Sequence, residues 1–216
     1  MRRSARSTKG PPTSSSRPSR SSSWGRHVPS SPLAAAVLED LRRSFRTYKA
    51  LGDRAIAQVA DADLARTPDA ESNSIAIIVK HLAGNMRSRF TEFLTSDGEK
   101  PDRHRDREFE PDDAVTRAAL LASWEAGWRT TFEAVEALDP EDLLRTVTIR
   151  QEPMTVLQAL NRQAAHYAYH VGQLVYLAKA LAGRGWQSLS IPRGQSARYS
   201  QGTYLKGNGS GSSQKA

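Results

Sequence analysis

Apolar residues recur at steps of three to four residues in four separate stretches of the chain. This spacing is that of helices with one buried face. A short run rich in β-branched residues, Thr146–Ile149, is instead typical of a strand. Four long helices with little strand predict an all-α fold, a four-helix bundle. The predicted helices cover about 33–60, 74–95, 112–138 and 155–183.

Polar and helix-breaking residues set the ends of these stretches. Asp97-Gly98 is expected to stop the second helix, and Asp139-Pro140 the third. Asp112 and Asp113 suit the first turn of the third helix, because carboxylates are stabilised by the positive end of the helix dipole. The sequence of Thr155–Gln158 has the form of a capping box, which predicts the start of the fourth helix.

Both ends of the chain differ in composition from the middle. Residues 1–31 are rich in Ser, Arg, Pro and Gly, and their few apolar side chains cannot offset the entropy of ordering. We predict a disordered basic Ser/Arg-rich tail over 1–31, a bundle domain over 32–193 and a flexible C-terminal tail over 194–216. The N-terminal tail also resembles an organellar transit peptide, but it lacks the regular apolar face of such peptides.

The formal net charge of +8 is distributed unevenly. Residues 1–31 contain seven Lys or Arg and no acid, which leaves 24 basic and 23 acidic side chains for the rest of the chain. The predicted bundle is therefore nearly neutral, and nucleic-acid binding is a disfavoured hypothesis that depends on the tail. No apolar run approaches the roughly 20 residues that span a bilayer, so we predict a soluble, cytoplasmic protein with no membrane partner.

Several classes of chemistry lack their residues in this sequence. The chain has no cysteine, which excludes disulfides, thiolate metal ligands and a cysteine nucleophile, so any thiol chemistry must use an external thiol. Phosphate-binding loops, dinucleotide glycine fingerprints and nucleophile elbows are also missing. These absences argue against nucleotide enzymes and serine hydrolases of the familiar kinds.

Two histidines on the fourth predicted helix form the strongest chemical signal. His166 and His170 are four residues apart, so their imidazoles stand on one face of the helix, close enough to share a metal ion. That face is otherwise largely apolar, which points the pair into the bundle. Burying imidazole nitrogens is costly unless they are hydrogen-bonded or bound to a metal.

A third imidazole, His81, lies on the inward face of the second predicted helix, where Gly84 and Ser88 are expected to leave open space beside it. Three histidines from two facing helices would leave coordination positions free for water or a substrate atom. Zinc, nickel, cobalt and iron(II) all accept imidazole, and the sequence does not choose between them. The alternative is that these histidines are hydrogen-bonded core or surface residues without an ion.

Other side chains are candidates for a supporting role around the site. Glu125 falls on the apolar stripe of the third predicted helix, which suggests a buried acid that orients a ligand histidine or carries a proton; the alternative is a solvated position at the rim. Asn85 and Arg89 follow His81 by one and two turns and are candidates for lining the pocket mouth, although Arg89 also suits a surface ion pair. Trp124 and Trp128 are better explained as core than as pocket walls.

A resemblance to a known family is carried by five motifs: Val79–Met86, Asp97–Pro101, Arg105–Phe109, His166–Gln173 and Ile191–Gly194. Over about Pro32–Ser196 the chain resembles the DinB/YfiT-like superfamily, and within it a branch of uncharacterised DinB-like proteins. The resemblance implies a metal-binding four-helix bundle whose histidine ligands are His81, His166 and His170. Known activities in the superfamily include thiol-dependent transfer and isomerisation with mycothiol, bacillithiol or glutathione, in which the metal lowers the thiol's pKa.

Two hypotheses from different classes follow. The first is a metal-dependent enzyme, a thiol S-transferase-like or hydrolase-like protein that activates an external thiol or water. The second is a bundle that binds a metal or small molecule without turnover. A small-molecule substrate or thiol is the expected partner and a homodimer is compatible with the sequence, while the substrate and catalytic groups stay unassigned.

Overall fold

The computed structural model describes residues 31–111 and 114–196. The predictions of disordered tails, and of a first helical turn at Asp112 and Asp113, fall almost entirely outside these residues. The described chain is predominantly helical with one small two-stranded sheet, as the apolar pattern predicted. Its long helices are α1 (Pro32–Ile56), α2 (Ile75–Phe90), α3 (Arg117–Glu136) and α4 (Val156–Ala182). Short 3₁₀ helices are η1 (Asp61–Asp63), η2 (Arg105–Phe109), η3 (Pro140–Leu144) and η4 (Gly183–Gly185).

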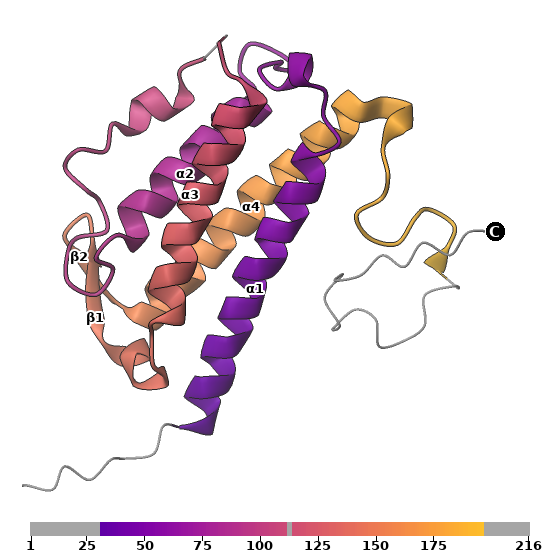
Figure 1. Cartoon of the computed structure of the whole chain (residues 1–216). Helices are drawn as coiled ribbons and strands as arrows, with labels where there is room; N and C mark the ends of the chain where they lie inside the picture. The colour runs from indigo at the N-terminus through magenta and orange to yellow at the C-terminus, as the bar shows by residue number, and fades with distance from the viewer. Residues whose placement is uncertain (1–30, 112–113, 197–216) are drawn as a thin grey trace, which may run out of the picture.

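The four long helices lie side by side, with α1 and α4 running in one direction and α2 and α3 in the other (Figure 1). Helix α1 packs on α4, and α2 packs on α3. Because α2 and α3 are parallel, the connection between them must return the chain along the helices, and η2 in this connection packs against α2. Trp124, Trp128 and Tyr167 are fully buried in the common core, which confirms the two tryptophans as core residues.

Two predicted helix ends are wrong by several residues. Helix α1 ends at Ile56, where the side chain of Arg117 donates hydrogen bonds to the carbonyls of Ile56 and Val59. Helix α2 ends at Phe90 instead of continuing to residue 95, because Thr91 is extended and Glu92 has a positive φ of 50°. The chain thus leaves the helix early and folds back along it.

The starts of the last two helices follow local hydrogen-bonding signals. Helix α3 begins at Arg117, later than the start predicted at about residue 112, because the hydroxyl of Thr116 accepts a hydrogen bond from the backbone of Ala119 and caps the helix there. The predicted capping box of α4 is confirmed, since Thr155 and Gln158 each accept a hydrogen bond from the other's backbone N–H. Side-chain caps of this kind satisfy N–H groups that have no partner within the helix.

The strand predicted at Thr146–Ile149 is confirmed as β1, and it pairs antiparallel with β2 (Glu152–Thr155). Sequence reasoning missed β2, because it contains Pro153, a residue that a sheet accepts only at an edge. The pairing of Ile149 with Glu152 leaves Arg150 and Gln151 as the two turn residues.

This turn places two residues other than glycine in the left-handed region, with φ values of 57° for Arg150 and 63° for Gln151. Such values suit the right-handed twist of a two-residue hairpin but are costly for side chains with a Cβ atom. Asp97 offsets that cost from outside the sheet. Its carboxylate accepts the backbone N–H of Arg150 at 2.9 Å and that of Gln151 at 2.7 Å.

Acid should weaken this anchoring of the hairpin. Hydrogen bonds from the backbone N–H of Glu99, and from those of Gln151 and Arg150, lower the pKa of Asp97 from 3.8 to about 2. A lowered pKa stabilises the fold above the unfolded value, and that stabilisation is lost as the pH falls from about 4 through about 2. Urea unfolding at several pH values should show a smaller loss in this window for Asp97→Asn than for the unmutated protein. Equal pH dependence would contradict this role.

Candidate metal centre

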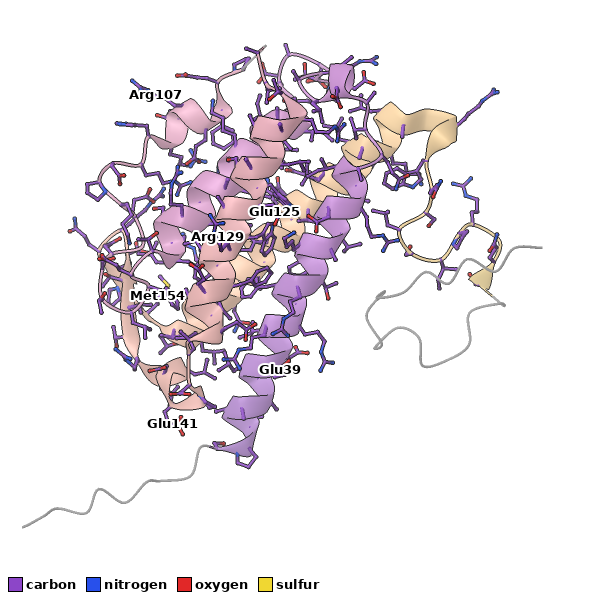
Figure 2. The ribbon with its side chains drawn as sticks, in the orientation of Figure 1. Glu39, Arg107, Glu125, Arg129, Glu141 and Met154 are labelled. Atoms are coloured by element: carbon purple, nitrogen blue, oxygen red, sulfur yellow. The ribbon has the colours of Figure 1, made fainter. Side chains whose placement is uncertain are left out.

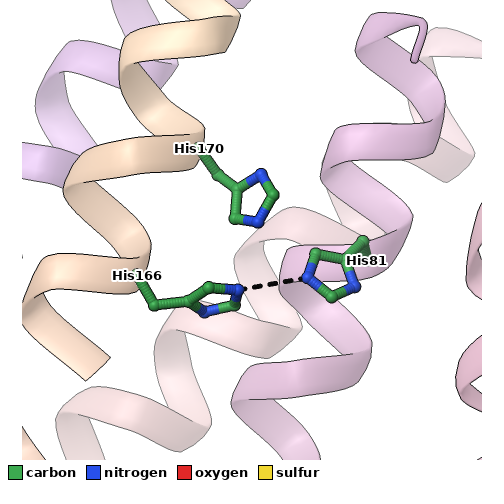
Figure 3. A group of neighbouring side chains, drawn as sticks. All are labelled: His81, His166 and His170. Atoms are coloured by element: carbon green, nitrogen blue, oxygen red, sulfur yellow. Dashed lines mark hydrogen bonds between the residues drawn. The ribbon is translucent and has the colours of Figure 1, made fainter. Parts of the chain in front are cut away.

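Three histidines from two helices meet in the interior. His81 comes from α2, and His166 and His170 come from successive turns of α4 (Figure 3). One nitrogen of each ring can be chosen so that all three lie within 4.8 Å of one another, and the Nε2 atoms of His81 and His166 are 3.2 Å apart. His81 and His170 are buried and His166 is partly exposed. The structure thus brings together all three histidines that the sequence singled out.

A buried carboxylate fixes the orientation of His81. Glu108, in η2, accepts a hydrogen bond of 2.9 Å from Nδ1 of His81. Burial opposes ionisation of Glu108, but hydrogen bonds from Arg103 and His81 outweigh it and lower the pKa of this acid. An ionised carboxylate only accepts hydrogen bonds, so Nδ1 of His81 carries the proton of this bond, and Nε2 is the nitrogen that faces the other histidines.

Glu108 is itself held by Arg103, which donates two hydrogen bonds of 2.8 Å to its two carboxylate oxygens. Gly84 makes this arrangement sterically feasible, since a Cβ atom there would lie 2.2 Å from Oε1 of Glu108. The expectation of open space beside Gly84 and Ser88 is therefore wrong. Glu108 fills the first position, and the hydroxyl of Ser88 donates to the carbonyl of Gly98.

The two histidines of α4 differ in their surroundings. Nδ1 of His170 hydrogen-bonds Oε1 of Gln173 at 2.8 Å, which leaves Nε2 as its lone-pair nitrogen. Nδ1 of His166 is buried without a hydrogen-bond partner in the described part of the chain. Burial, followed by repulsion from His170 and His81, lowers the pKa of His166 to about 3, and burial also lowers that of His170. Both imidazoles are therefore neutral near pH 7, the form that binds metals.

Phe109 covers one side of the site. Its ring lies 4.7 Å from that of His81, and the guanidinium of Arg105 lies 5.0 Å from the centre of the Phe109 ring. The short helix η2 therefore supplies both the acid that orients His81 and the aromatic ring that packs on it. The sequence signal for this was an acid followed by an aromatic residue, Glu108-Phe109, in a connection that is otherwise strongly charged.

Asn85 and Arg89 extend the row of His81 along α2, but their side chains are engaged elsewhere. The side-chain oxygen of Asn85 accepts a hydrogen bond of 3.3 Å from the hydroxyl of Tyr167. Arg89 is 5% exposed; it bonds the carbonyl of Gly98 and the carboxylate of Glu99. Both side chains are buried and bond other parts of the protein instead of lining a pocket mouth. Arg89 forms a buried ion pair instead of a surface one.

Of the two alternatives for Glu125, the structure agrees with the solvated position at the rim. Its side chain is 56% exposed and forms an ion pair of 2.8 Å with Lys49 of α1. Figure 2 shows Glu125 on the outer side of α3, between α3 and α1. The acid lies just beside the buried stripe of α3, and a charged side chain at such an edge turns to water and to a nearby cation.

Three converging imidazoles in a mostly buried setting, two of them hydrogen-bonded through Nδ1, define a class: a helical protein with a three-histidine candidate metal site. Residues 33–195 match the family described as "Protein of unknown function (DUF1572)". The match covers well over half of the chain, and the protein belongs to this family. No curated protein matched the sequence. Within residues 31–111 and 114–196, every helix is too short or too polar to cross a membrane.

Proposed function

We propose that the protein binds one divalent metal ion on His81, His166 and His170, and that it is a four-helix bundle of the DinB-like type. The observation that carries the proposal is the convergence of three imidazole nitrogens within 4.8 Å of one another. The buried Nδ1 of His166, which lacks a partner among described residues, is the further sign that this ring serves another purpose than core hydrogen bonding.

The residues around the histidines suit a metal. Glu108 accepts a hydrogen bond from Nδ1 of His81, and Gln173 accepts one from Nδ1 of His170. The opposite nitrogen of each ring, Nε2, therefore faces inwards as a possible metal ligand. The close approach of the Nε2 atoms of His81 and His166, at 3.2 Å, requires one of them to carry a proton that a bound ion would replace. Imidazole donors favour zinc, nickel or iron(II) over magnesium or calcium.

We further propose that the site is catalytic and acts on a small molecule with an external thiol or water as nucleophile. A metal bound by three protein ligands retains open positions, and it favours the deprotonated form of a thiol or water. The chain has no cysteine, so the thiol would be a low-molecular-weight compound. The partly exposed His166 marks the side from which such a molecule would approach.

Two measurements in sequence test the proposal. Elemental analysis of protein purified without an affinity tag should find close to one zinc, nickel or iron ion per chain. Consumption of an electrophile such as 1-chloro-2,4-dinitrobenzene should then require both glutathione, or another small thiol, and the metal, and His170→Ala should abolish it. Metal without turnover over a panel of thiols and electrophiles would favour a non-catalytic binding bundle. Protein that retains no metal and takes up none would refute the site.

A further inference from the structure

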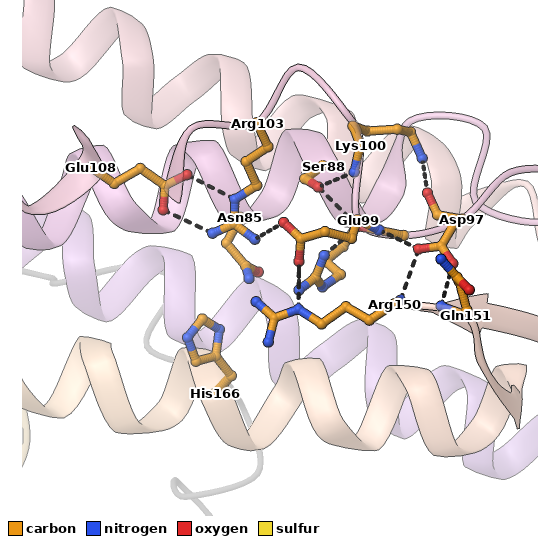
Figure 4. A network of polar contacts seen from close by, with 12 residues as sticks. Asn85, Ser88, Asp97, Glu99, Lys100, Arg103, Glu108, Arg150, Gln151 and His166 are labelled. Carbon is orange, nitrogen blue, oxygen red and sulfur yellow. Dashed lines mark hydrogen bonds and ion pairs between the residues drawn. The ribbon is translucent and has the colours of Figure 1, made fainter. Parts of the chain in front are cut away.

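A network of charged side chains reaches the histidines through Glu108, which accepts a hydrogen bond from His81, and three of its members are arginines (Figure 4). Glu99 lies at their centre, since it accepts hydrogen bonds of 2.9 Å from Arg89 and from Arg150 and lies 3.4 Å from Arg103. Glu108 is paired with Arg103 on the other side. The network also includes Asp97 and Lys100, so it contains four cationic and three anionic side chains and carries a net charge of +1.

The three arginines differ in exposure and in how many of their guanidinium nitrogens are bonded. Arg89 and Arg103 have side chains that are each 5% exposed, and both are bonded to buried groups of the protein. Arg150 differs, because its side chain is 54% exposed and only its Nε is bonded, to Glu99. Its two terminal nitrogens have no hydrogen-bond partner within residues 31–111 and 114–196, so they are open to a ligand.

The backbone also fixes the position of Arg150. Asp97 accepts its N–H, and Glu99 accepts its Nε–H, so the side chain is held at both ends of its length. Figure 4 shows the guanidinium reaching back from the hairpin in the direction of His166. A guanidinium held in this way offers two parallel N–H donors, the arrangement that binds a carboxylate with two hydrogen bonds.

We propose that Arg150 is a specificity-determining residue that binds a carboxylate of the small molecule that enters the histidine site. This inference rests on the proposed function, because the other end of that molecule would be the atom held at the metal. A guanidinium with two free terminal nitrogens, in a network of net positive charge, favours anionic over neutral molecules, and its fixed geometry limits the entropy lost on binding. The substrate or thiol is then a small molecule with a carboxylate near its reacting group.

The test compares two thiols that differ in charge on the cobalt(II)-loaded full chain. Mercaptoacetate carries a carboxylate and 2-mercaptoethanol does not, and thiolate binding to cobalt is followed by its absorption. We expect mercaptoacetate to bind about tenfold more tightly, the equivalent of one charge-assisted hydrogen bond. Arg150→Gln should remove this preference while leaving the affinity for 2-mercaptoethanol unchanged. Arg150→Lys should retain part of this preference, because lysine keeps the positive charge but lacks the two parallel N–H donors of a guanidinium.

The matched control is Arg145→Gln, which removes an arginine that is 51% exposed and paired with Asp142 at the other end of β1. It should preserve the preference. A preference that is absent in the unmutated protein, or that survives in Arg150→Gln, would overturn the role of Arg150 while leaving metal binding intact. Failure of cobalt to bind at all would instead refute the proposed function and this inference with it.

Discussion

Zinc, nickel or iron(II) is expected to raise the melting temperature of the protein, and chelation to lower it. The three histidines lie on two helices, and residues 81 and 170 are far apart in the sequence, so the unfolded chain cannot assemble them with comparable affinity. A ligand that binds only the folded state stabilises it by mass action. At a free metal concentration of 100 times the dissociation constant, the gain is about 2.7 kcal/mol.

Single substitutions separate this effect from nonspecific binding by histidine. His81→Ala and His170→Ala should each lose most of the metal-dependent rise, although they lie on different helices. His104→Ala should retain it, because His104 is exposed in the connection between α2 and η2. The measurement is fluorescence melting of each variant with and without metal, anaerobically for iron(II). If His81→Ala and His170→Ala respond to metal as the unmutated protein does, the three-histidine site is wrong.

The histidine cluster could be predicted because it follows from helical periodicity. His166 and His170 share a face of α4, and His81 lies on the inward face of α2, so the packing of two buried faces brings them together. Periodicity resolves a helix face only coarsely. Glu125 lies at the edge of a buried stripe, and the nearby Lys49 draws it to the surface, which no pattern within α3 could reveal.

Residues in irregular segments were the ones that sequence reasoning missed. Glu108 lies in the connection between α2 and α3, where no periodic pattern indicates burial, and its role depends on Gly84, a residue on another element. The hairpin turn at Arg150 and Gln151 also lacks the usual Asn-Gly signal. It is stabilised instead by Asp97, remote in sequence, which accepts the backbone N–H groups of both residues. Such positions are set by tertiary contacts, which helical periodicity within one segment does not describe.

Glu108 is predicted to control the metal affinity of the site without touching the ion. Glu108→Gln can no longer hold the proton of His81 on Nδ1 with a charged acceptor, so affinity should fall by about 10–100-fold, the usual effect of losing such a partner. Glu108→Ala should also destabilise the fold by about 3–5 kcal/mol, because it leaves Arg103 buried without its main counter-charge. Metal titration by calorimetry and urea unfolding measure the two effects.

Gly84→Ala tests the same contact from the opposite side. Its Cβ atom would lie 2.2 Å from Oε1 of Glu108, so the carboxylate must shift and its hydrogen bonds to Arg103 and His81 are disturbed. Metal affinity should therefore fall although every charged residue is retained. Glu125→Gln is the matched control for Glu108→Gln, since it replaces an exposed acid by the same amide and should leave metal affinity unchanged. Equal affinities for Glu108→Gln, Gly84→Ala and Glu125→Gln would mean that His81 does not depend on Glu108, and that the buried pair of Glu108 and Arg103 serves only to hold η2 against α2.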